Sequence, residues 1–123
     1  MNRLKDSVLH NKSLAFGVRI IKFYQFLCDE KKEYVLSKQI LRSGTAIGAN
    51  CRECRNAQSN ADFSNKLSIA LKEADETQYW LELFLFSGII NQEEFDSLNK
   101  DVSELVAILT TSIKTIKTKT SKN

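Results

Sequence analysis

The stretch LSKQILRSGTAIGANCRECRNAQSNADFSNKLSIALKEADETQYWLELF, residues 36–84, decides the fold of this chain. Its apolar and small residues recur every three or four positions, the spacing of a helix that buries one face. One short polar run near residue 59 interrupts the pattern, which predicts two antiparallel helices over residues 33–58 and 61–87. The positions predicted to be buried are Leu36, Ile40, Ser43, Ile47, Cys51 and Cys54, then Phe63, Leu67, Ala70, Ala74, Thr77, Leu81 and Phe84.

The same periodicity on both flanks predicts helices over residues 13–28 and 91–117. Gly88 is suited to end the third helix, and Asn91 with Glu94 forms a capping-box pattern at the start of the fourth. We therefore predict one domain over residues 1–123, an all-α, antiparallel up-down-up-down four-helix bundle with a basic tail at 114–123. The outer helices should bury Phe16, Ile20, Phe23 and Leu27, widened by Leu14, Val18 and Ile21, and Phe95, Leu98, Val102, Leu105, Leu109, Ser112 and Ile116.

The composition agrees with a helical domain. Hydrophobic residues make up 42% and charged residues 27%, and the chain has no proline and only four glycines, too few turn residues for an all-β fold. No apolar run is long enough to span a membrane, and the N-terminus lacks the apolar region of a secretory signal. With an odd number of cysteines, three, we expect free thiols and a cytoplasmic location.

Two glycines, Gly44 and Gly48, fall inside the second predicted helix, where each costs about 1 kcal/mol relative to alanine. Close approach of another backbone, within the bundle or between subunits, would offset that cost. A loop is the alternative, but Ile40, Ile47 and Cys51 stay in phase across the segment, which favours a helix.

A second stripe of small, charged and aromatic residues runs beside the buried positions of the middle helices, about 100° around each axis. It has two interpretations: a solvated flank that pairs charges between neighbouring helices, or a polar interface between subunits of a homo-oligomer. The candidate interface residues are Gln39, Arg42, Ala46, Ala49, Glu53, Glu73, Glu76 and Trp80.

The net charge of +3 is only mildly basic, but no acid follows Glu104, whereas four lysines do. Those lysines suit a frayed helix end, which keeps the tail in solution, or a basic arm that contacts phosphate. Exposed basic residues of this kind bind RNA or DNA backbone without specifying sequence. The candidate nucleic-acid-binding residues are Lys38, Arg52, Arg55, Lys114, Lys117 and Lys119.

Catalysis has few suitable residues. The single histidine, His10, falls in a segment predicted to be mobile, and Glu73 with Glu76 lacks the histidine of di-iron motifs. Cys51 and Cys54 form a Cys-x-x-Cys without a second ligand pair, so we interpret both as core residues. We expect no enzymatic activity, metal or cofactor.

At the level of motifs, residues 36–84 resemble the four-helix-bundle proteins of the 23S rRNA intervening-sequence type, and the resemblance extends into both flanking helices. The family pattern is Gln-x-x-Arg-Ser/Ala-x-x-Ser-Ile-x-x-Asn, then Asp-Phe, then Lys-Glu-x-x-Glu-x-x-Tyr-Trp-Leu. In this chain the matching residues are Gln39, Arg42, Ser43, Ile47 and Asn50, then Asp62 and Phe63, then Lys72, Glu73, Glu76, Tyr79, Trp80 and Leu81. Ala46 stands where the family usually has serine, and Cys54 where it often has alanine.

The resemblance implies an antiparallel bundle that assembles into rings of five and has no enzymatic activity. It also implies a link to nucleic acid, since a related accessory protein of diversity-generating retroelements binds nucleic acid and a reverse transcriptase through a basic surface. Two hypotheses follow: a homo-oligomer that binds RNA or DNA backbone, or a scaffold that binds another bacterial protein such as a reverse transcriptase. Fold alone does not decide between them.

Overall fold

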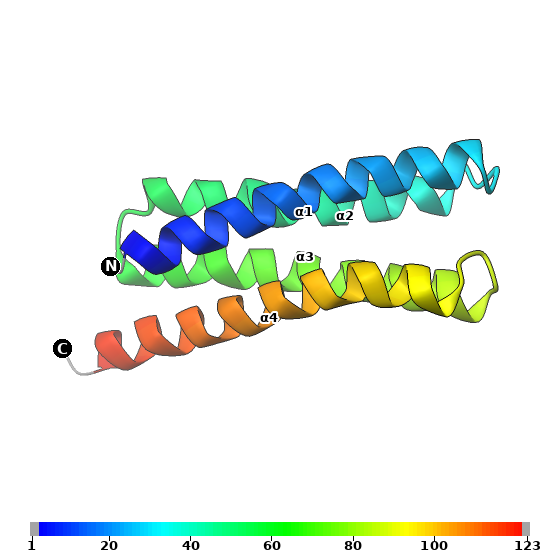
Figure 1. Ribbon diagram of the computed structural model, residues 1–123. Coiled ribbons are helices and arrows are strands. Elements are labelled where there is room, and N and C mark those ends of the chain that lie inside the picture. Colours follow the sequence, from blue (N-terminus) through cyan, green and yellow to red (C-terminus); the bar gives the residue numbers. More distant parts are fainter. Residues whose placement is uncertain (1–2, 122–123) are drawn as a thin grey trace.

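The computed structural model describes residues 3–121, with side chains for residues 8–119. Four helices follow one another: α1 (Arg3–Asp29), α2 (Leu36–Glu53), α3 (Asn60–Phe86) and α4 (Gln92–Ser121), with a 3-10 turn, η1 (Cys54–Asn56), after α2. Each helix runs antiparallel to the next, and α1 with α2 lies over α3 with α4 in two layers (Figure 1). The predicted all-α four-helix bundle is confirmed.

The bounds of the first two helices differ from the prediction. Helix α1 begins at Arg3 rather than Ser13, because Leu9 is buried seven residues before Phe16 and continues the same stripe. His10 therefore lies in a helix, and its assignment to a mobile segment was wrong. Helix α2 begins at Leu36, three residues later than predicted, and its regular turns end at Glu53.

The core agrees with most of the predicted positions. Every position predicted to be buried in α3 is buried. In α2 and α4 the exceptions are Leu36, Phe95 and Ser112, which are half-buried. The prediction failed for Leu14, Val18 and Ile21, which are 55%, 48% and 45% exposed. At 100° per residue these three lie about 150° around α1 from the buried stripe, so they face away from the core.

Gly44 and Gly48 lie in a regular part of α2 that packs closely on α1. A Cβ added to Gly44 would lie 2.7 Å from Cγ1 of Ile20, and one added to Gly48 would lie 3.3 Å from the carbonyl oxygen of Ser13. The predicted close approach therefore occurs within the bundle, and these glycines are explained without a partner subunit.

The connection between α3 and α4 follows directly from its residues. Gly88 adopts a positive φ of 81°, and the N–H groups of Gly88 and Ile89 donate to the carbonyls of Leu85 and Phe84, a Schellman motif that ends α3. The side chain of Asn91 accepts from the N–H of Glu94, and the Glu94 carboxylate accepts from the N–H of Asn91, both at 2.8 Å. This reciprocal pair confirms the predicted capping box.

The carboxylate of Glu33 caps the N-terminus of α2. The Glu33 side chain accepts hydrogen bonds from the N–H groups of Val35, Leu36 and Ser37 at 3.2, 2.9 and 2.6 Å. Burial opposes the charge of Glu33, but these three donors outweigh it and lower its pKa. Glu33 therefore precedes the helix, which begins at Leu36, and caps it with its side chain.

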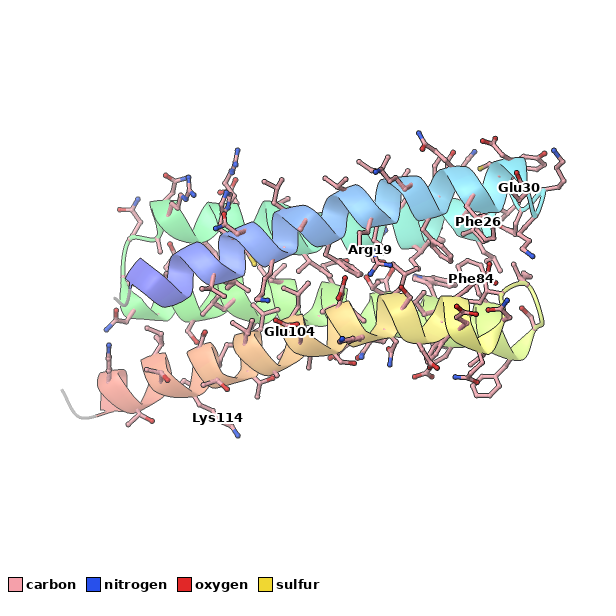
Figure 2. All side chains as sticks on the ribbon, viewed as in Figure 1. Arg19, Phe26, Glu30, Phe84, Glu104 and Lys114 are labelled. Carbon is pink, nitrogen blue, oxygen red and sulfur yellow. The ribbon has the colours of Figure 1, made fainter. Side chains whose placement is uncertain are left out.

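Polar bridges close the seam between the first and last helices, which touch more sparsely than helices adjacent in the chain. Arg19 of α1 reaches α4, where its guanidinium donates to Asp101 at 2.6 Å and to the hydroxyl of Ser97 at 2.7 Å. Lys12 forms an ion pair with Glu104 further along the same seam. Figure 2 shows Arg19 and Glu104 between the two layers.

Candidate nucleic-acid interface

Antiparallel packing brings the start of α1, the end of α2, the start of α3 and the end of α4 to one end of the bundle (Figure 1). Five of the six predicted nucleic-acid-binding residues lie near this end, and all five are exposed. We call this group the basic end; its members are Arg52, Arg55, Lys114, Lys117 and Lys119. The sixth, Lys38, is exposed at the start of α2, about 21 Å from Arg52 along the helix axis, and does not belong to the group.

The basic end has two corners rather than one continuous patch. Arg52 and Arg55 come from the end of α2 and from η1, whereas the three lysines come from α4, and α2 and α4 do not pack against each other. Lys114 points away from the bundle (Figure 2). An extended polyanion could follow the end of the bundle from one corner to the other.

These five cations have no acidic partner among the side chains described, residues 8–119. The nearby Asp62 is already engaged, because it accepts the N–H of Gln58 at 3.0 Å and pairs with Lys66 at 2.9 Å. Those two hydrogen bonds, with the Gln58 N–H contributing most, lower the pKa of Asp62. The charge of the basic end is therefore available to a ligand.

His10 adds a titratable group beside the first corner. Partial burial is the main reason that its pKa falls below 6.5, and the nearby cations Arg55 and Arg52 lower it further. Sequence reasoning missed this proximity because it began the first helix at Ser13, after His10. The buried Leu9, seven residues before Phe16, could have revealed that α1 extends past His10.

The candidate interface residues lie mostly on the α2–α3 side, where several of them pair within one chain. Arg42 of α2 forms ion pairs with Glu73, at 3.2 Å, and with Glu76 of α3. The indole of Trp80 donates to Glu76 at 3.0 Å, and this bond, more than the Arg42 contact, lowers the pKa of that carboxyl. These contacts match the charge-pairing interpretation. Of the remaining candidates, Gln39, Ala49 and Glu53 are exposed and Ala46 is half-buried.

A groove that the sequence analysis did not identify lies between α1 and α2. Its volume is about 400 Å³, and the exposed side chains of Leu14, Val18 and Ile21 line it on α1. Small residues of α2, among them Gly48 and Ala49, line the other side, and His10 and Arg52 lie at one end. The spacing of Leu14, Val18 and Ile21, four residues and then three, was a signal in the sequence for a second apolar face on α1.

Two of the three cysteines belong to the core, as predicted, and the third, Cys28, is half-buried. Cys51 and Cys54 are buried, and burial, with the neighbouring Cys54, raises the pKa of Cys51 to about 12, so it stays a thiol. Among the described side chains, no three His, Cys, Asp or Glu residues are arranged to hold a metal ion. None of the helices within residues 3–121 is both long enough and apolar enough to cross a bilayer.

Comparison with known proteins gives the family. Residues 5–111 match the family model described as 23S rRNA-intervening sequence protein. The chain belongs to this family. The predicted resemblance to intervening-sequence proteins is thus confirmed.

A solved structure agrees with this family assignment. A crystal structure of a protein of unknown function from the S23 ribosomal protein family of Bacteroides thetaiotaomicron VPI-5482 is 57% identical to the chain, with a TM-score of 0.87. The match covers 89% of this intervening-sequence protein and 98% of the other chain. No curated protein matches.

Proposed function

We propose that this intervening-sequence protein is a non-catalytic homo-oligomer that binds the backbone of RNA or DNA through its basic end. The observation that supports the proposal is the gathering of Arg52, Arg55, Lys114, Lys117 and Lys119 at one end, without acidic partners among the described side chains. When unpaired Lys and Arg side chains bind phosphates, they release the counterions condensed on the nucleic acid, and this release favours binding.

The chemistry of the end favours phosphate over bases. Arg52 and Arg55 provide planar guanidinium donors, which bind phosphate oxygens in pairs, and the lysines of α4 provide mobile point charges. Among the described side chains, none that is aromatic and exposed accompanies these cations, so bases find no stacking partner in this part of the chain. The proposed binding is therefore independent of sequence and sensitive to salt.

The test is fluorescence anisotropy with a labelled single-stranded RNA and a labelled DNA duplex at about 50 mM and about 200 mM salt. The wild-type protein should bind both probes, and its affinity should fall steeply with salt. The double variant Arg52→Glu/Arg55→Glu should weaken binding at least about tenfold and reduce the salt slope by about two.

Lys100→Glu is the matched control, because Lys100 is an exposed lysine of α4 that lies far from the basic end. Its affinity should stay within about twofold of the wild type, since a screened charge at that distance has little effect. Absence of binding at low salt, or equal losses in the control and the double variant, would refute the proposal.

The alternative hypothesis, a scaffold for another bacterial protein, gains support from the apolar groove between α1 and α2. Exposed apolar patches on otherwise polar surfaces mark sites of protein contact. Purification after nuclease treatment separates the two functions: a stoichiometric protein partner, together with no RNA or DNA binding, would favour the scaffold.

A further inference from the structure

The outer face of α1 has an apolar stripe that the monomer leaves uncovered. Leu14, Val18 and Ile21 are each about half exposed, and their spacing places them in one line over two helical turns. Thr45, Gly48 and Ala49 of α2 form the opposite wall of the groove, and these small residues would allow another helix to come close. We call this surface the α1–α2 face.

Charge on this face has one sign. Arg52 lies at one end of the groove, and Lys38 belongs to the same row of α2, because Lys38, Thr45 and Arg52 repeat every seven residues. No Asp or Glu lines the groove within the described side chains. A second α1–α2 face placed against the first would bring like charges together, which disfavours a symmetric pairing.

The other layer of the bundle has the opposite charge. Residues 1–56 hold eleven of the eighteen Lys and Arg but five of the fifteen acids, whereas residues 57–123 hold the other ten acids, all between Asp62 and Glu104. On α3, two acids and two aromatic residues alternate at helical spacing on an exposed stripe. This stripe, Asp75, Tyr79, Glu82 and Phe86, is called the α3 stripe.

We propose that the α1–α2 face of one copy docks onto the α3 stripe of a second copy. The inference rests on the homo-oligomer of the proposed function and names the two surfaces that meet. Apolar side chains lie on both surfaces, and the positive rim of one matches the negative rim of the other. Because the two surfaces differ, the contact is head-to-tail. The rotation that relates one subunit to the next then decides whether the subunits form a closed ring or an open chain.

Two single variants block one surface each. Val18→Glu puts a charge at the centre of the α1–α2 face, and Tyr79→Glu puts one in the α3 stripe; both side chains are already about half exposed, so the bundle should keep its helicity by circular dichroism. By light scattering and native mass spectrometry, the wild-type protein should be a multiple of 14.0 kDa and each variant a monomer. Ala15→Glu is the control, because Ala15 is exposed about 100° around α1 from Leu14, and it should keep the wild-type mass.

Mixing the two variants is the decisive step. Val18→Glu keeps an intact α3 stripe, and Tyr79→Glu keeps an intact α1–α2 face, so a head-to-tail contact can form once, and the mixture should give a one-to-one heterodimer. A mixture that stays monomeric, a Val18→Glu variant with the wild-type mass, or a wild-type monomer would each overturn the inference. The test is separate from nucleic-acid binding, since all five residues of the basic end are unchanged in both variants. A monomeric Val18→Glu chain that binds RNA would leave the binding proposal standing whether or not the heterodimer forms.

Discussion

At Gly44 a single missing methyl group sets how closely α1 and α2 approach. The Cβ of an alanine there would lie 2.7 and 2.9 Å from the two γ carbons of Ile20, whose side chain is fully buried. Gly17 on α1 is the opposite case, since nothing lies within 4 Å of its added Cβ. The two glycines therefore differ in what they contribute, although both lie within helices.

Gly44→Ala should destabilise the protein by about 1–3 kcal/mol, because overpacking exceeds the gain in helix propensity. Gly17→Ala should stabilise it by up to about 1 kcal/mol, because alanine favours the helix without a clash. Urea unfolding followed by circular dichroism measures both. Equal effects of the two substitutions would contradict the steric explanation.

Glu33 gives a prediction that depends on pH. Its pKa is lowered in the folded protein, so its contribution is fully present above its ordinary value of 4.5 and is lost as the pH falls through the lower folded value. Glu33→Gln should cost about 1 kcal/mol at neutral pH, and the difference from the wild type should shrink below pH 4.5. Glu30→Gln, an exposed neighbour that caps nothing among the described residues, should show a smaller loss in the same urea titrations.

At the scale of elements, the two proposed roles of the last helical turns can be separated. Ile113 and Ile116 are 9% and 6% exposed, so α4 packs on the bundle well into its lysine-rich end, while Lys114 and Lys117, the residues that directly follow them, are exposed. A frayed end would leave these isoleucines in water. The packed end instead holds the lysines on a rigid helix.

A chain that stops after Lys117 should therefore keep nearly the wild-type stability, whereas one that stops after Ser112 should lose about 3–5 kcal/mol with its two buried isoleucines. Thermal unfolding of both truncated chains tests this. If the shorter chain unfolds at the wild-type temperature, the end of α4 is not part of the core.

Helix periodicity predicted the elements well where one face is buried and the other is charged. In α3 every predicted core position is buried, including the polar Thr77, whose hydroxyl bonds that of Ser43 at 2.9 Å. In α1 the same reasoning failed, because Leu14, Val18 and Ile21 are as apolar as core residues but lie on a different face. Periodicity gives the faces of a helix, and the neighbours of each face depend on tertiary packing.

The candidate site was only partly predictable for the same reason. The sequence identifies exposed cations, but the basic end depends on which helix ends meet, and this separates Lys38 from Arg52 although both lie on α2. The proximity of His10 to Arg52 and Arg55 joins residues more than forty positions apart and leaves no local pattern. The contacts of Arg42 with Glu73 and Glu76 were anticipated as one of two interpretations.

At the scale of the whole molecule, His10 links the basic end to pH. In the free protein its pKa is held below 6.5, and a bound polyanion beside it would favour the protonated form. Binding should then take up a proton, so RNA affinity should rise as the pH falls from about 7.5 to about 5.5. His10→Gln should flatten this slope and leave the affinity at pH 7.5 nearly unchanged, as measured by anisotropy. A slope that is identical in the variant would exclude His10 as its source.

An even number of antiparallel helices returns the chain to the end where it started, so the start of α1 and the end of α4 both lie at the basic end (Figure 1). Any purification tag, fluorophore or fusion partner attached at either terminus would crowd the very surface that an RNA assay seeks to measure. A circularly permuted chain, joined across its old termini and opened between Lys31 and Lys32, would carry its label at the far end of the bundle instead.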